Sequence, residues 1–278
     1  MRLGGPIFDK APNPASWVDA MRRAGYSAGW LPVETKTDAA LVQDYVDAAA
    51  KADLVVAEVG AWSNPISPDD AARKQAVAYC SGQLALAERI GARCCVNIAG
   101  GRGEQWDGPH PDNLSAATFD LIVEAVRQII DAVRPSRTFY TLETMPWVYP
   151  DSADSYLRLI RAVDRKAFAV HLDPVNMINC PERYFRTGDF IRDCVHKLGP
   201  HIRSCHAKDI TLSGRLTVHL DECRPGMGAL DYRAYLTALD TLGPDLPLMI
   251  EHLPNAEEYA AAARHIRNVA DEAGVRIR

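Results

Sequence analysis

The sequence lacks the features of membrane-spanning, low-complexity and exported proteins. It has no low-complexity tract, no long run of like charges, and no stretch of about 18 uncharged apolar residues such as a membrane-spanning helix needs. The N-terminal segment MRLGGPIFDK has no basic region followed by a long apolar run, so we expect no export signal. These absences predict a soluble, cytoplasmic protein without a membrane partner.

Positive charge and paired cysteines are also scarce. The 31 basic and 36 acidic residues give a formal net charge of −5, whereas nucleic-acid-binding proteins usually carry a basic surface. We therefore expect no nucleic-acid partner. The seven cysteines show no C-x-x-C spacing, which indicates buried, reduced thiols rather than a disulfide framework or a zinc ribbon.

What the sequence does contain is a regular alternation of strand-like and helix-like segments. The strand-like apolar segments are residues 2–8, 27–33, 54–61, 92–100, 138–144, 168–174, 202–209 and 246–253. The amphipathic segments that follow them are residues 15–25, 39–52, 69–91, 115–133, 153–163, 189–199, 231–243 and 256–274. No G-x-G-x-x-G follows the first strand, which disfavours a dinucleotide-binding sheet. Eight such units without a linker predict one α/β domain over residues 1–278, folded as a single (β/α)8 TIM barrel.

Three segments between a strand and its helix are longer than a minimal turn: residues 100–114, 174–188 and 210–230. In a barrel of this kind, all three lie at the carboxyl ends of the strands. Long loops gathered on one rim are expected to form the walls of a substrate pocket.

Four successive strands end in a candidate metal ligand. These residues are Glu143, Asp173, His206 and Glu251. Because side chains alternate along a strand, one ligand per strand at similar height can point into the mouth of the barrel. Three neighbouring buried carboxylates would be strongly destabilised without a cation. An oxygen-rich set without thiolate suits one divalent ion, with Mn²⁺ favoured and Mg²⁺ or Co²⁺ as alternatives.

These strand ends, together with RPGMGALDY (residues 224–232) and MIEHL (residues 249–253), resemble the xylose isomerase-like barrel superfamily of sugar isomerases and epimerases. The likeness is strongest to its ketose 3-epimerase branch and is most diagnostic over residues 140–255. It implies a small-molecule sugar substrate and a divalent ion held by the four residues above. It further implies that Glu143 and Glu251 serve as acid and base, and that a homodimer or homotetramer forms.

The chemistry of a ketose explains this dual use of two glutamates. The proton on the carbon beside the carbonyl is weakly acidic, and a metal ion stabilises the enediolate that forms when it leaves. Carboxyl groups on opposite sides of the metal can remove a proton from one face and return one to the other, which is epimerisation. We therefore expect a metal-dependent sugar epimerase or isomerase.

The sequence departs from the superfamily at Asn176, where much of the superfamily carries a histidine. Asn176 keeps a polar contact but loses a titratable group, which leaves the substrate and the proton route open. His171 lies two residues before Asp173 on the same strand face, and either supports the metal site from below or is an ordinary core histidine.

Further candidates lie on the last long loop and on other strand ends. Lys208 either binds a substrate oxygen, a carboxylate or a phosphate, or pairs with Asp209 or Glu222 at the rim. Arg224 resembles the family's loop arginine that contacts substrate hydroxyls; His219 shares its loop. The remaining candidates, proposed for the pocket floor and for packing against a sugar ring, are Glu58, Asn97, Trp62, Trp106 and Trp147.

Three other functions are weighed against the epimerase. A lyase of the same superfamily would use the same site for β-elimination on a 3-keto sugar or glycoside. A DNA-repair endonuclease with this barrel needs more histidines and a basic surface, whereas this chain has Asn97, Asn176 and a negative charge. A non-enzymatic binding module would bind metal without exchanging a substrate proton. No glycine-rich phosphate cradle is present, so a free sugar or glycoside is preferred.

Overall fold

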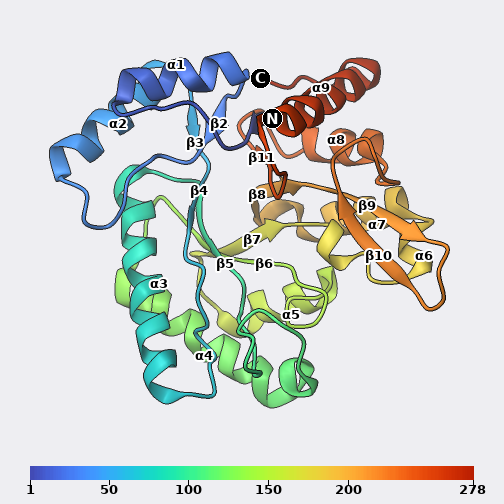
Figure 1. The fold of residues 1–278 in the computed structure, drawn as a ribbon. Coiled ribbons are helices and arrows are strands. Elements are labelled where there is room, and N and C mark those ends of the chain that lie inside the picture. The colour runs from blue at the N-terminus through green and yellow to red at the C-terminus, as the bar shows by residue number, and fades with distance from the viewer.

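The computed structural model describes residues 1–278 and shows a ring of parallel strands surrounded by helices (Figure 1). Neighbours in the sheet follow one another along the chain, with the first strand also paired to the last. The strands are β1 (Arg2–Gly4), β2 (Ala28–Gly29), β3 (Val55–Val56), β4 (Glu58–Gly60), β5 (Cys94–Asn97), β6 (Tyr140–Glu143), β7 (Phe168–Leu172), β8 (Ile202–Ala207) and β11 (Pro247–Ile250). This order is that of a TIM barrel.

The ring closes at Ala57. β3 pairs with β2 and β4 pairs with β5, so one strand position is divided into two segments. Ala57 lies between them; its N–H donates to the carbonyl of Gly29 at 3.0 Å, and its carbonyl accepts from the N–H of Cys94 at 3.3 Å. The nine segments of the sheet therefore occupy the eight strand positions of the predicted barrel, which is confirmed.

The predicted helices are also confirmed, and each covers the outside of the ring. They are α1 (Pro14–Ala24), α2 (Ala39–Lys51), α3 (Asp70–Ile90), α4 (Ala116–Val133), α5 (Ala153–Val163), α7 (Thr187–Leu198), α8 (Tyr232–Asp240) and α9 (Ala256–Ala273). A short extra helix, α6 (Pro181–Tyr184), and three 3₁₀ turns, η1 (Pro111–Leu114), η2 (Val175–Met177) and η3 (Gly199–His201), complete the set. None of the helices combines the length and apolar character that a membrane crossing requires.

Local sequence explains where the helices begin and end. The side chain of Ser115 accepts from the N–H of Thr118 at the start of α4, and Ser152 caps α5 in the same way through Ser155. α1 ends at Gly25, whose φ of 72° lies in the left-handed region that glycine adopts without strain. These caps fix the ends of the loops that run to and from the strands.

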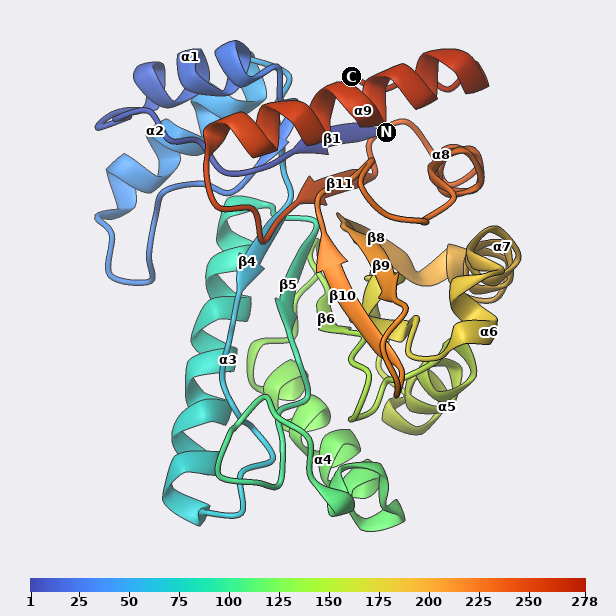
Figure 2. The same cartoon turned by 45° about the vertical axis from the view of Figure 1, so that its right-hand side comes forward.

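The hairpin formed by β9 (Asp209–Ser213) and β10 (His219–Cys223) was not predicted; residues 210–230 were expected to be a long loop. The two strands pair antiparallel with each other and lie outside the barrel sheet (Figure 2). Most of their residues are partly or fully exposed. Ile210 and Leu212 nevertheless alternate with polar residues along β9, a strand signal that the prediction of a loop overlooked.

Tyr156 of α5 fixes two neighbouring strands beneath the predicted site. Its hydroxyl accepts from the N–H of Leu142 at 3.0 Å and lies 2.6 Å from the carbonyl of Leu142 and 2.9 Å from that of Ala169. These contacts tie β6 to β7 just before Glu143 and Asp173. One cluster of 63 buried hydrophobic residues surrounds this region, and all seven cysteines are unpaired.

Candidate metal centre

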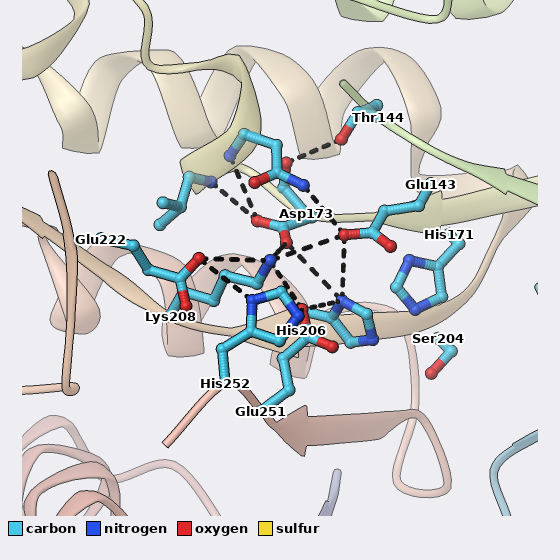
Figure 3. Close-up of polar contacts among 12 residues, drawn as sticks. Glu143, Thr144, His171, Asp173, Ser204, His206, Lys208, Glu222, Glu251 and His252 are labelled. Carbon is cyan, nitrogen blue, oxygen red and sulfur yellow. Dashed lines mark hydrogen bonds and ion pairs between the residues drawn. The ribbon is translucent and has the colours of Figure 1, made fainter. Parts of the chain in front are cut away.

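The four predicted ligands converge at the carboxyl ends of their strands (Figure 3). One side-chain atom from each of Glu143, Asp173, His206 and Glu251 lies within 4.8 Å of the other three. The Nδ1 atom of His206 is 2.8 Å from Oε1 of Glu251, 3.3 Å from Oε1 of Glu143 and 3.6 Å from Oδ2 of Asp173. Because the first three are buried and Glu251 nearly so, the structure gathers three carboxylates and one imidazole away from bulk water.

Backbone contacts orient the carboxylate of Asp173. Its Oδ1 accepts from the N–H of Val175 at 3.0 Å and from the N–H of Asn176 at 3.3 Å, at the start of the η2 turn. The Thr144 hydroxyl donates to the carbonyl of Asp173 at 2.7 Å. Oδ1 is therefore engaged by the turn, and Oδ2 is directed at the other ligands.

Asn176 contacts the site through Glu143. Its side-chain Nδ2 donates to Oε1 of Glu143 at 2.9 Å. The residue that departs from the superfamily pattern therefore holds one of the two candidate acid–base carboxylates in place. An amide does this without adding another titratable group.

Lys208 points into the same cluster. Its Nζ lies 2.6 Å from Oε1 of Glu251, 2.9 Å from Oδ2 of Asp173 and 3.6 Å from Oε1 of Glu143. The side chain is only 1% exposed, so the ammonium is held inside the site. Two ion pairs were considered for Lys208 as a rim lysine. Its Nζ lies 3.6 Å from Oε2 of Glu222, so that pair is present. The carboxylate of Asp209 instead accepts hydrogen bonds from backbone N–H groups.

The cluster favours the charged forms of its members. Burial raises the pKa of Glu251, but His206 and Lys208 outweigh it and lower that pKa to about 2. Burial lowers the pKa of Lys208, but Asp173, Glu143 and Glu251 hold it well above its usual range. Burial likewise lowers the pKa of His206, but Glu251 and Glu143 outweigh it and raise that pKa well above its usual range.

The donor atoms fit a divalent cation. Oδ2 of Asp173 and Oε1 of Glu251 are buried and accept no well-aligned hydrogen bond. With a neutral His206, the three carboxylates and the ammonium of Lys208 carry a net charge of −2, which one divalent ion neutralises. Three oxygens and one imidazole nitrogen match the preferences of Mn²⁺, Mg²⁺ and Co²⁺.

A second group of buried polar residues lies on the other side of His206. It consists of Glu58, His171 and Ser204, none more than 2% exposed. Nε2 of His171 is 3.0 Å from Oε1 of Glu58, and the imidazole rings of His171 and His206 are 4.1 Å apart. Figure 3 shows His171 and Ser204 across His206 from Lys208. The predicted pocket-floor residue Glu58 therefore lies beside the cluster but outside its four ligands.

Asp209 organises the loop that carries the RPGMG motif. Its Oδ2 accepts from the N–H groups of Gly226 and Gly228 at 2.9 and 3.0 Å, and its Oδ1 from that of Leu230 at 2.8 Å. A Cβ at Gly228 would lie 2.4 Å from both Oδ1 of Asp209 and the carbonyl of Ile210. The close approach of the backbone to Asp209 explains why glycine stands at this position.

Arg224 and Asn97 are engaged with protein groups elsewhere. Nε of Arg224 lies 2.8 Å from Oε2 of Glu258 on α9. The side chain of Asn97 is fully buried, accepts from the N–H of Ser63 and donates to its carbonyl, both at 3.2 Å. Neither residue contacts the four ligands, so their predicted contacts with substrate remain predictions.

The three loop tryptophans do not gather around the cluster. Trp62 and Trp106 line a cavity of about 670 Å³ together with Tyr79 of α3, and none of the four ligands lines it. Trp147 lies apart from that cavity, and its Nε1 donates to the carbonyl of Asp107 at 2.9 Å. The structure therefore pairs two of the indoles in one cavity and separates the third.

Sequence reasoning missed two residues at the site. Ser204 precedes His206 by two positions on β8, and this period-two spacing is the signal that could have found it. His252 follows Glu251 and adopts a φ of 58°. Its Nδ1 is 3.2 Å from Oε2 of Glu222, and this contact, with burial opposing it, raises the pKa of His252.

Comparison with known proteins agrees with this fold. The profile of the xylose isomerase-like TIM barrel family matches residues 18–269. No curated protein sequence shows significant similarity to the chain.

Several solved structures share the fold at low sequence identity. A xylose isomerase-like TIM barrel protein from Mycobacterium smegmatis, in complex with magnesium, has a TM-score of 0.68 and 17% identity, covering 98% of this chain and 97% of that one. The 3-keto-D-glucoside 4-epimerase from E. coli has a TM-score of 0.71 and 15% identity, and the match covers 96% of this chain and 99% of that one. D-psicose 3-epimerase from Clostridium cellulolyticum H10, solved with D-tagatose, has a TM-score of 0.67 and 15% identity, and the match covers 97% of this chain and 99% of that one. Since the family profile spans most of the sequence, the chain belongs to the xylose isomerase-like TIM barrel family.

Proposed function

We propose that this protein is a metal-dependent epimerase or isomerase of keto-sugars, which moves a proton on a carbon next to a carbonyl. The observation that carries this proposal is the convergence of three carboxylates and one imidazole within 4.8 Å of one another. The epimerases of a 3-keto-glucoside and of D-psicose that share the fold support the substrate class.

The ligand set would hold one divalent ion through Glu143, Asp173, His206 and Glu251, with Mn²⁺ favoured and Mg²⁺ or Co²⁺ as alternatives. When bound, the ion supplies Lewis-acid stabilisation of negative charge on the substrate oxygens. The Mycobacterium smegmatis protein that shares the fold was solved in complex with magnesium, which supports the proposal of a divalent ion.

Glu143 and Glu251 are proposed as the acid–base pair. β6 and β11 are separated in the sheet by β7 and β8, so the two carboxyl groups approach the cluster from different directions. Glu251 is a carboxylate at neutral pH, which is the form that accepts a proton. Glu143, held by Asn176, would return a proton on the opposite face.

Lys208 is proposed to donate a hydrogen bond to a substrate oxygen beside the acid–base pair. Its ammonium already contacts Asp173 and Glu251, and Arg224 contacts Glu258. Because both cations are paired with carboxylates, we propose an unphosphorylated keto-sugar or glycoside as substrate. By analogy with the family, we expect a homodimer or homotetramer, which sedimentation velocity will test.

The test is proton exchange followed by NMR. The Mn²⁺-loaded protein is incubated in deuterated water with a panel of ketoses and 3-keto-glycosides. We expect deuterium to enter one carbon of one substrate, with inversion at that carbon and no change of mass beyond the label. The variants E143Q and E251Q should each abolish inversion, and Asp221→Asn, an exposed change on β10, should not.

Two other results would replace the proposal. Loss of water or of an aglycone from the same substrates would make the protein a lyase, which would use the same residues to begin a β-elimination. Binding of Mn²⁺ without any exchange across the panel would contradict a proton-transfer enzyme and favour a binding protein.

A further inference from the structure

Glu58 occupies a defined position inside the barrel, beside the metal centre but outside its ligand set. Its Oε1 accepts from the Ser204 hydroxyl and faces Nε2 of His171 at 3.0 Å. Its Oε2 accepts from Nε1 of Trp30 at 3.3 Å and lies 3.7 Å from Nε2 of His206. With a side chain only 1% exposed, Glu58 is fixed by protein groups alone.

The two ring nitrogens of His206 face two different sets of carboxylates. Nδ1 lies within 3.6 Å of an oxygen of each of Glu143, Asp173 and Glu251. Nε2 is directed at Glu58. An imidazole binds a metal ion through one neutral nitrogen, and the group that faces its other N–H determines which nitrogen is free.

The spacing of residues along the strands produces this arrangement. Every second residue from position 204 to 208 points to the same side of the chain, at successive heights along it; these residues are Ser204, His206 and Lys208. Ser204 contacts Glu58, Lys208 contacts the metal ligands, and His206 between them contacts both groups. The ring of His171 packs edge-on against His206, at an angle of 69°, and limits its rotation.

We propose that Glu58 is a positioning residue: its carboxylate, 3.7 Å from Nε2 of His206, attracts the N–H at that nitrogen and so leaves Nδ1 free to face a metal ion. This assignment rests on the metal centre of the proposed function and gives Glu58 a role other than substrate binding. Ser204 and His171 act on Glu58 in turn, because each contacts its Oε1. Such partners of metal-bound histidines typically change metal affinity by about 10- to 100-fold.

The experiment measures metal binding rather than turnover. Mn²⁺ affinity is determined by calorimetry for the wild type, E58Q, S204A and the control T141V. Thr141 is also fully buried on a barrel strand, but its hydroxyl donates to the carbonyl of Cys95. We expect E58Q to weaken Mn²⁺ binding about 10- to 100-fold, S204A to weaken it less, and T141V to leave it unchanged.

A second measurement uses NMR to identify which nitrogen of His206 is protonated in the wild-type protein. Its result does not depend on whether a variant folds. ¹⁵N-histidine-labelled protein loaded with diamagnetic Mg²⁺ should show His206 protonated at Nε2. Two results would overturn the role of Glu58 and leave the metal centre in place. The first is protonation of His206 at Nδ1, and the second is that E58Q and S204A fold and bind Mn²⁺ with wild-type affinity. A wild type that binds no Mn²⁺ would remove the metal centre itself, and this inference with it.

Discussion

The ammonium of Lys208 lies 2.9 Å from Oδ2 of Asp173 and is buried among the candidate metal ligands. This ion pair links the residue that follows β7 to the residue that follows β8. In the absence of a divalent ion, Lys208 is the nearest positive side chain to Glu143, Asp173 and Glu251 besides His206. We therefore expect Lys208 to contribute to the stability of the metal-free barrel and to lower the negative charge that a bound ion would meet.

Replacing Lys208 with methionine will destabilise the metal-free protein by about 3–5 kcal/mol, because buried carboxylates lose their partner. Addition of Mn²⁺ will raise Tm more in K208M than in the wild type, since the ion then supplies the missing positive charge. Differential scanning calorimetry with and without Mn²⁺ measures both effects. The control K197M removes a partly exposed lysine paired with Asp154 and Asp193, and should change neither value greatly. Equal Mn²⁺ shifts in K208M and the wild type would contradict this role.

Asp173→Asn is expected to weaken Mn²⁺ binding by about 100-fold or more, because it removes an oxygen of the proposed ligand set, and loss of a ligand's outer partner alone typically costs about 10- to 100-fold. The fold should persist, since Oδ1 of the amide still accepts from the N–H groups of Val175 and Asn176. Calorimetric titration and circular dichroism check the two expectations separately. A folded D173N with wild-type affinity would show that the ion binds elsewhere.

Gly228→Ala will disrupt the loop after the β9–β10 hairpin, because the added Cβ would lie 2.4 Å from Oδ1 of Asp209 and from the carbonyl of Ile210. We expect a loss of about 1–3 kcal/mol in the free energy of unfolding. Gly214→Ala is the matched control, because a Cβ at Gly214 meets no atom within 4 Å. Urea denaturation of both variants measures the difference, and equal stabilities would refute the packing argument.

Glu88 of α3 stabilises the approach to β6 in a pH-dependent manner. Its carboxylate accepts from the N–H groups of Ser136, Arg137 and Thr138 and from the Ser136 hydroxyl. Burial raises the pKa of Glu88, but these hydrogen bonds outweigh it and lower the pKa to about 2. A lowered carboxyl pKa means stability that is present above the unfolded-state pKa and lost as the pH falls toward about 2.

The variant E88Q tests this dependence. It should be less stable than the wild type at pH 7, and the difference should shrink as the pH falls from about 4 toward 2. Denaturation at a series of pH values measures the difference. A gap that stays constant over this range would show that ionisation of Glu88 does not contribute.

The sequence predicted the barrel and the convergence of its ligands because both follow from local periodicity. The strand-then-helix alternation places Glu143, Asp173, His206 and Glu251 at equivalent points of successive strands, and closure of the ring brings them together. The extent of the domain, residues 1–278, and the roles of the individual site residues stay predictions.

Contacts between side chains of distant segments could not be predicted in the same way. The commitment of Asp209 to Gly226, Gly228 and Leu230 depends on the path of a loop, which no periodicity encodes. The pairing of Arg224 with Glu258 likewise depends on where α9 crosses that loop. The β9–β10 hairpin, by contrast, has a sequence signal, because Ile210 and Leu212 before the turn and Val218 and Leu220 after it alternate with polar residues.

The peptide bond between Lys208 and Asp209 joins two residues whose side chains contact different parts of the structure. On one side of it the ammonium neutralises the acidic cluster, and on the other the carboxylate gathers the backbone of residues 226–230. A substitution that displaces this glycine-containing turn would break hydrogen bonds at Asp209, one peptide bond from the buried ammonium. The backbone at this dipeptide is thus constrained from two directions, by buried ion pairs on one side and by the turn on the other.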